Sequence, residues 1–88
     1  MELKAAFGKA LRQQRHSKKL SQEAFSNVSS RTYMSALERG LKNPTLEKVE
    51  EIANTLEIHP LTLLTRCYAL KDNESAESLL SKIESELK

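Results

Sequence analysis

Apolar residues recur at helical spacing through most of the chain, beginning at its N-terminus. Over about residues 2–18 they fall three or four positions apart, which predicts an amphipathic first helix with a basic outer face. The apolar positions are Leu3, Ala6, Phe7, Ala10 and Leu11, and the basic residues on or after the outer face are Lys9, Arg12, Lys18 and Lys19.

Two short helices joined by a turn are predicted between residues 20 and 46. Ser21 is a suitable N-cap for the first of them. Residues 27–30 cannot all continue that helix and form the expected turn, after which Ser30 or the serine before it caps the second helix. Gly40 ends the second helix, as a glycine just past a helix end should. The expected inward residues are Ala24 and Phe25 in the first helix, and Tyr33 or Met34, with Leu37, in the second.

Three further helices are predicted in the C-terminal half. Thr45 is expected to cap the first, and His59 with Pro60 to open the next, since proline suits the first helical position. This penultimate helix is apolar around nearly its whole circumference, which predicts burial within the domain or against a partner. Residues 71–74 interrupt the pattern, and a last amphipathic helix follows from Ser75. The apolar positions of the three helices, in chain order, are Leu46, Val49, Ile52, Ala53 and Leu56 in the first, Leu61, Leu63, Leu64, Cys67, Tyr68 and Leu70 in the second, and Ala76, Leu79, Leu80, Ile83 and Leu87 in the third.

Composition favours one small all-helical domain. The 88 residues include two glycines and two prolines, and aromatic residues make up 5%. Few helix breakers and few aromatic side chains favour helices over a sheet. We therefore expect an all-α fold in which residues 1–70 form the main domain and residues 71–88 add a C-terminal helix.

Several functions are not expected from this sequence. The single Cys67 excludes an internal disulfide, and His16 and His59 lack a set of acidic or cysteine partners, so no metal site is expected. No combination of nucleophile, base and orienting residue can be assembled and no glycine-rich phosphate loop is present, so we expect neither an enzyme nor a cofactor. No apolar run could span a bilayer and no signal-peptide pattern opens the chain, so a cytoplasmic protein is expected.

Charge is segregated along the chain. Residues 1–42 carry nine Lys and Arg against three acidic residues, a net charge of +6. Residues 43–88 carry five basic and nine acidic residues, a net charge of −4. The N-terminal half therefore suits a polyanion, and the C-terminal half would be repelled by one.

The two short helices in the basic half carry the chemistry best suited to a function. The first turn of the second helix begins with Ser30, Arg31 and Thr32. Exposed polar side chains with one arginine, held at a helix start, are what reading base edges in a DNA major groove requires. The sequence therefore predicts a helix-turn-helix that binds double-stranded DNA.

Several short motifs stand in one order along residues 7–65. They are Leu11 with Arg15, LSQE at 20–23, SRTYMS at 30–35, LERG at 37–40 and NPTL at 43–46. In this order they resemble the lambda-repressor/Cro-like helix-turn-helix regulators, often called the Xre family. The segment from Gln22 to Gly40 is slightly shorter than usual in that family and has no glycine in its turn, so a clipped first helix or a tighter turn is expected.

The resemblance implies a five-helix lambda-repressor-like domain that acts as a sequence-specific transcriptional regulator, expected to be a repressor. The helix of about residues 30–39 would enter the major groove, and a homodimer would bind a palindromic operator. A protein of this kind would belong to a bacterium or phage and associate with the nucleoid. The resemblance also implies a structural ion pair between Arg15 and Glu38. Expected base contacts are Arg31, Thr32, Ser35 and Ala36, and expected DNA-backbone contacts are Gln22, Ser30, Tyr33, Arg39, Lys42 and Asn43.

A dimer interface is predicted on the last two helices, because the penultimate one is apolar all round. The last helix has heptad-like spacing over too short a length to establish a coiled coil, and the alternative is that it packs on its own domain. The predicted interface residues are Leu63, Cys67, Leu70, Leu80, Ile83 and Leu87.

Two other functions stay open. The protein could be an antitoxin or a restriction-modification controller, whose C-terminal segment contacts another protein. From a different class, it could be a protein–protein interaction module without an operator. An interaction module has no need of a charge of +6 concentrated around the turn, which favours DNA binding.

Overall fold

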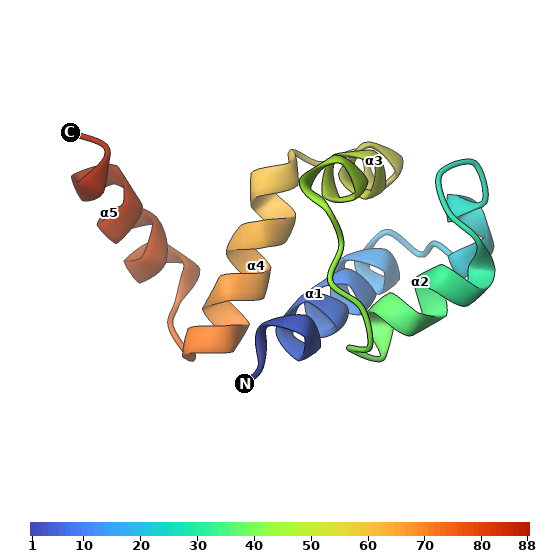
Figure 1. The fold of residues 1–88 in the computed structure, drawn as a ribbon. Coiled ribbons are helices and arrows are strands. Elements are labelled where there is room, and N and C mark those ends of the chain that lie inside the picture. Colours follow the sequence, from blue (N-terminus) through green and yellow to red (C-terminus); the bar gives the residue numbers. More distant parts are fainter.

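The computed structural model describes residues 1–88, and every regular element in it is a helix (Figure 1). The elements are α1 (Leu3–Ser17), the 3-10 helix η1 (Gln22–Phe25), α2 (Arg31–Glu38), α3 (Leu46–Leu56), α4 (Pro60–Asp72) and α5 (Ala76–Glu86). The all-α prediction is confirmed, and the helices follow one another in the predicted order. No helix has both the length and the apolar character needed to cross a membrane.

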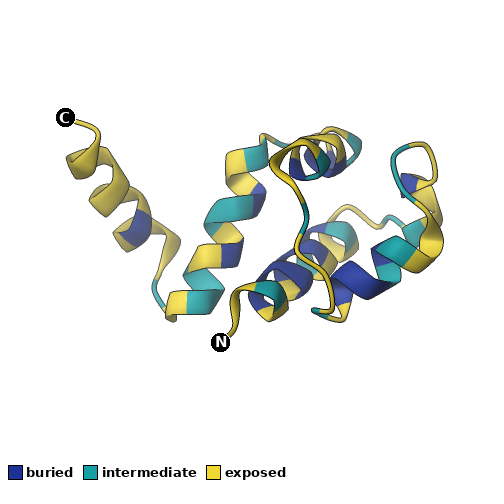
Figure 2. Ribbon diagram, viewed as in Figure 1, coloured by how far each residue is buried: buried dark blue, intermediate teal, exposed yellow.

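The core forms around α1, which packs along α4 and against α2 (Figure 1). Figure 2 shows the buried residues of α1, α2 and α3 on the sides where these helices face one another. One apolar cluster therefore joins η1 to the first four α-helices and fixes their mutual orientation. Its largest fully buried side chains are Leu11, Phe25, Met34, Leu37, Ile52, Leu56, Leu63 and Cys67.

Helices α1 and α2 approach each other closely at Gly8. A Cβ atom added there would lie 2.4 Å from the carbonyl oxygen of Leu37 and 2.7 Å from that of Glu38. Side-chain carbon and carbonyl oxygen cannot come this close, so only glycine allows the end of α2 to cross α1 at this distance.

Helix α2 ends in a Schellman motif at Gly40, whose φ of +74° is the left-handed conformation that glycine adopts without strain. The Gly40 N–H donates to the Leu37 carbonyl and the Leu41 N–H donates to the Ala36 carbonyl, both at 3.0 Å. These bonds satisfy carbonyls at the end of α2 and turn the chain toward α3.

Four of the predicted helix starts carry a side-chain cap. Ser30, Thr45 and Ser75 each accept a hydrogen bond from the backbone N–H three residues later, at 3.0, 3.1 and 3.0 Å. The ring Nδ1 of His59 accepts from the N–H two residues later at 3.0 Å. Ser21 occupies the predicted N-cap position of η1, but its side chain makes no cap hydrogen bond: η1 is a single 3-10 turn, and the backbone carbonyl of Ser21 accepts from the N–H three residues later at 3.1 Å.

Several residues of the predicted apolar faces are exposed, among them Leu3, Ala24 and Leu46. Ala24 is exposed because the single turn of η1 directs only Phe25 into the core. Leu46 is 80% exposed because it occupies the first position of α3, beyond the edge of the core. A residue at a helix end can match the periodicity of a face without reaching the residues that the face covers.

Helix α4 is only partly buried within one chain, so of the two predicted alternatives complete burial inside the domain is wrong. Leu63 and Cys67 are fully buried, whereas Leu61 is 61% exposed and Tyr68 is 40% exposed. Within one chain α4 is covered by α1, α3 and the start of α5, which leaves an apolar side open.

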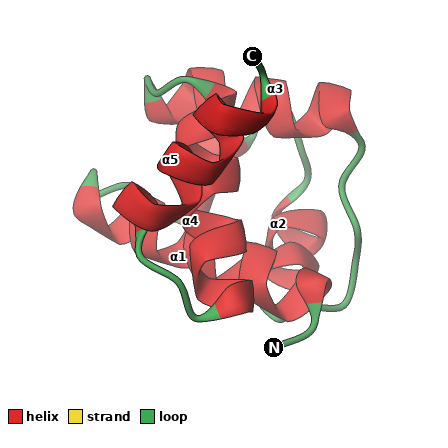
Figure 3. Ribbon diagram, turned by 90° about the vertical axis from the view of Figure 1, so that its left-hand side faces the viewer, coloured by secondary structure: helices red, strands yellow, loops and turns green.

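Helix α5 projects from one end of the molecule and packs on α4 (Figures 1 and 3). Asn73 separates the two helices in a left-handed conformation, with a φ of 51°. Because α4 continues to Asp72, the predicted boundary between residues 70 and 71 falls inside a helix. Leu79 is the one buried residue of α5. With α5 projecting in this way, the molecule extends 38 Å along its longest axis against 24 and 23 Å along the other two.

Candidate nucleic-acid interface

The first turn of α2 presents its side chains to solvent. Ser30 ends the turn after η1 and caps α2 by accepting the Tyr33 N–H. Arg31 and Thr32 follow and are exposed, and Ser35, about one turn further on, is partly exposed. These three side chains are the ones on α2 that are free to meet base edges.

Ala36 is placed differently from the prediction, whereas Tyr33 packs partly inward, which is one of the two placements predicted for it. Ala36 is 7% exposed because it lies on the side of α2 that faces the core, so the structure contradicts a base contact from its side chain. Tyr33 is half-buried against the core, and the ammonium of Lys48 lies 5.8 Å from the centre of its ring.

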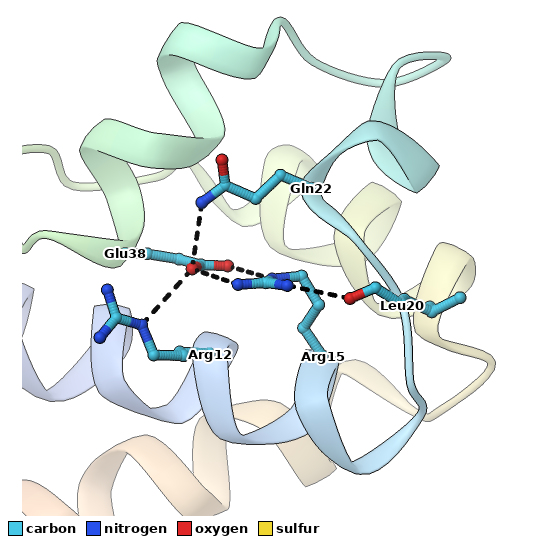
Figure 4. A network of polar contacts seen from close by, with 5 residues as sticks. All are labelled: Arg12, Arg15, Leu20, Gln22 and Glu38. Carbon is cyan, nitrogen blue, oxygen red and sulfur yellow. Dashed lines mark hydrogen bonds and ion pairs between the residues drawn. The ribbon is translucent and has the colours of Figure 1, made fainter.

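The C-terminal end of α2 is held by an ion-pair network centred on Glu38 (Figure 4). Arg15 Nε donates to Glu38 Oε2 at 2.6 Å, and Arg15 Nη2 donates to Glu38 Oε1 at 2.9 Å. Gln22 Nε2 donates to Glu38 Oε1 at 3.2 Å, and Arg15 Nη1 donates to the Leu20 carbonyl at 2.9 Å. The bidentate pair implied by the resemblance thus joins α1, η1 and α2 at one point.

Electrostatics keep this network ionised. Burial alone would raise the pKa of Glu38, but the hydrogen bonds from Arg15 and Gln22, together with the charges of Arg15 and Arg12, lower that pKa below its usual value. The hydrogen bond with Glu38 raises the pKa of Arg15. With side chains 11% and 1% exposed, Arg15 and Glu38 form a pair that water screens little.

Basic side chains flank α2 on the surface. Arg12 Nε lies 3.6 Å from Glu38 Oε1, but the Arg12 side chain is 54% exposed. It borders a shallow hollow together with Lys9, His16 and Arg39. Lys42 and Asn43 are exposed in the loop after α2. The expected backbone contacts Arg39, Lys42 and Asn43 are therefore accessible, whereas the Gln22 amide is already engaged with Glu38.

An acidic residue also stands beside the expected reading residues. Glu23 of η1 lies 3.3 Å from Arg31 Nη1, and both side chains are more than 70% exposed. No sequence motif indicated this pair, nor the close approach at Gly8 or the position of Lys48, because each depends on the packing of separate helices.

Only some of the residues predicted for the dimer interface lie on the surface of the chain. Leu63 and Cys67 belong to the core of one chain and cannot contact a partner, which corrects that part of the prediction. Burial raises the pKa of the Cys67 thiol, in spite of the nearby charge of Lys71. Leu70 is half-buried, whereas Leu80, Ile83 and Leu87 are 50%, 38% and 81% exposed.

An apolar groove runs between α4 and α5 beside these exposed residues. It is lined by Leu61, Leu64, Thr65, Tyr68, Leu79 and Ile83. Figure 2 shows that almost all of α5 is exposed.

Known proteins share both the sequence pattern and the fold. Residues 10–63 match the helix-turn-helix family HTH_3. Control protein C.BamHI of Bacillus amyloliquefaciens is 42% identical over 65 residues, which cover 70% of this chain and 80% of that protein. Among solved structures, the clp gene regulator ClgR of Corynebacterium glutamicum matches with a TM-score of 0.77 and 25% identity, over 94% of this chain and 90% of its own. The restriction-modification controller protein C.AhdI of Aeromonas hydrophila matches with a TM-score of 0.64 and 35% identity, over 68% of this chain and 94% of its own.

The matched segment contains α2, the turn before it and the ion-pair network at its C-terminal end. It includes the turn after η1, the cap at Ser30, the exposed Arg31 and the Arg15–Glu38 pair. The chain belongs to the helix-turn-helix family, and it is a DNA-binding transcriptional regulator.

Proposed function

We propose that the protein acts as a homodimer on a palindromic operator, with α2 of each protomer in a major groove. The observation that carries this proposal is the contrast between the two ends of α2. Its C-terminal end is fixed by the partly buried Arg15–Glu38 pair, whereas its first turn exposes Arg31 and Thr32. A rigid helix with a free polar start can hold base-reading side chains in one register.

Different side chains are assigned to base readout and to backbone contact. Arg31, Thr32 and Ser35 would read base edges, and Arg39, Lys42 and Asn43 would contact phosphates on either side of the groove. Phosphate contacts would supply much of the affinity and make it fall with salt. The charge of +6 over residues 1–42 supports this arrangement, and an interaction module without an operator would not need it. The function is binding, and no catalytic step is proposed.

The dimer would form through the apolar side of α4 and α5 that one chain leaves open. Leu61, Leu80 and Leu87 are all at least half exposed, which is unusual for leucines that share one end of a small domain. A two-fold axis at this end would place the two copies of α2 apart, with half-site centres about 10 bp from each other.

Selection from random duplex DNA by the purified protein tests the proposal. We expect enrichment of a two-fold symmetric sequence at moderate salt. Enrichment of a single asymmetric half-site would contradict the dimer, and no enrichment by the folded protein at any salt would contradict the operator.

A narrower candidate is a controller of a restriction-modification system. Two of the relatives carry that description or the name of control protein, and their identities of 42% and 35% exceed the 25% of the clp gene regulator. The expected observation is a restriction or modification gene beside the coding sequence, with the selected operator upstream of it. An operator that maps only to unrelated genes would count against this candidate.

A further inference from the structure

Lys48 of α3 reaches back to the turn that precedes α2. Its Nζ donates a hydrogen bond to the Val28 carbonyl and lies 5.8 Å from the centre of the Tyr33 ring. The same Nζ is 2.9 Å from Glu51 Oε1, and the Lys48 side chain is 26% exposed. Lys48 thus links α3 to residues on both sides of the start of α2.

Within the chain, Lys48 supplies the hydrogen-bond donor to the Val28 carbonyl. The other backbone hydrogen bonds of the turn converge on the Phe25 carbonyl, which accepts the Val28 N–H at 3.0 Å and the Ser29 N–H at 2.9 Å. No backbone N–H donates to the Val28 carbonyl. Val28 is partly buried, so loss of this donor would leave its carbonyl less well satisfied, and the turn has no glycine that could relax its shape.

The position of this carbonyl connects Lys48 to DNA readout. Val28 stands two residues before the cap Ser30, and Tyr33 is the residue whose N–H that cap accepts. Arg31 and Thr32 lie between these points. The Glu38 network fixes the far end of α2, whereas the contacts of Lys48 restrain its first turn.

We propose that Lys48 is a positioning residue for sequence recognition: it holds the start of α2 in place and makes no contact with DNA. This inference rests on the proposed role of α2 as the recognition helix. Glu51 forms an ion pair with the Lys48 ammonium at 2.9 Å, and the Val28 carbonyl already uses one of its three donors. The side chain therefore contributes geometry rather than positive charge.

The test compares Lys48→Met with Lys42→Met, a matched loss of one charge at an expected phosphate contact. Affinity is measured over a range of salt concentrations, on the selected operator and on random-sequence duplex. For Lys48→Met we expect about a tenfold loss on the operator, little change on random DNA, and an unchanged slope of log affinity against log salt. For Lys42→Met we expect a loss on both duplexes and a slope smaller by about one.

Three results would overturn the inference about Lys48. They are wild-type affinity of Lys48→Met for the operator, an equal loss on both duplexes, or a slope that falls as it does in Lys42→Met. Wild-type protein that binds no duplex at all would instead overturn the proposed function, and the role of Lys48 with it.

NMR on the wild-type chain provides a second test that does not depend on the folding of a variant. The lysine ammonium resonances are compared between free protein and its operator complex. We expect the Lys48 resonance to keep its free-state position while that of Lys42 shifts. A shift of the Lys48 resonance as large as that of Lys42 would show a phosphate contact and overturn the positioning role.

Discussion

Arg31 is the residue on which sequence preference is expected to depend most. Its guanidinium is exposed and pairs with Glu23 at 3.3 Å, an exposed contact that water screens and that a base can replace. Arg31→Ala should cost about 1–3 kcal/mol on the operator and relax the preference at one base pair. Titrations against single-base-pair variants of the operator measure both effects. If Arg31→Ala and Lys42→Met lost the same affinity on every sequence, the division between base and phosphate contacts would be wrong.

Glu38 is the residue on which the stability of the interface depends most. Glu38→Gln leaves the partly buried Arg15 guanidinium without its counter-charge, and removal of one partner of such a pair costs about 3 kcal/mol. Urea denaturation followed by circular dichroism measures the loss. Glu50→Gln, on the exposed side of α3, is the matched control and should change stability by less than about 0.5 kcal/mol. Equal stabilities of the two variants would contradict the structural role of the pair.

The lowered pKa of Glu38 predicts that the free energy of unfolding depends on pH. The folded-state pKa of Glu38 is lowered from a usual value of 4.5. Its ionised form therefore contributes fully to stability above that usual value, and the contribution is lost as pH falls through the lower, folded-state pKa. Between about pH 6 and about pH 3 the wild-type chain should lose more stability than Glu38→Gln, as measured by urea midpoints. Parallel losses in the two proteins would show that other carboxylates dominate the acid response.

At the scale of elements, the close crossing of α1 and α2 depends on Gly8, which has no side chain. Gly8→Ala improves helix propensity by about 1 kcal/mol but places a Cβ within 2.4 Å of the Leu37 carbonyl oxygen. The helices must separate, so we expect a net loss of about 1–3 kcal/mol and weaker DNA binding. Thermal melts of Gly8→Ala and of Lys9→Ala, an exposed neighbour on α1, measure the difference. A Gly8→Ala variant more stable than wild type would show that the two helices adjust without cost.

Helix order and caps could be predicted from the sequence because they depend on local residues. Ser30, Thr45 and Ser75 cap through N–H groups three positions away, and Gly40 ends α2 within its own turn. Periodicity also predicted the buried Met34 and Leu37, together with most of the core.

The remaining features depend on distances between elements, which a pattern along one element does not contain. The exposure of Leu46 follows from where the core stops, and that of Ala24 follows from the brevity of η1. The resemblance implied a base contact from Ala36, but this residue faces inward once α2 packs against the rest of the domain. Lys48 belongs to no motif, and its contact with Val28 exists only because α3 returns to the turn.

At the scale of the whole molecule, the two ends of the chain have different surfaces. Helix α2 lies at one end of the molecule and α5 at the other (Figure 1), and the exposed apolar side chains of α4 and α5 include Leu61, Leu80 and Leu87. A dimer built at the apolar end would keep both copies of α2 free for DNA. It would also bury the apolar residues that one chain leaves exposed. Helix α4, which is apolar around nearly its whole circumference, would then be buried by its own chain on one side and by the partner on the other.

Leu80→Glu tests this arrangement, because Leu80 is 50% exposed in one chain and should become buried in the dimer. A carboxylate there would have to be desolvated at the interface, so we expect the variant to be a folded monomer. Sedimentation equilibrium should give the 10.0 kDa mass of one chain for Leu80→Glu and twice that mass for wild type. Ser81→Glu adds the same charge at the next position of α5 and should remain dimeric.

The same pair of variants links assembly to recognition. Two tethered half-sites raise affinity through effective concentration, so Leu80→Glu should bind the full operator at least about 100-fold more weakly than wild type. Its affinity for an isolated half-site should not change, since α2 and α5 lie at opposite ends of the molecule (Figure 1). A dimeric Leu80→Glu would place the interface elsewhere on the molecule. A monomeric variant that kept full operator affinity would show instead that one copy of α2 is sufficient for recognition.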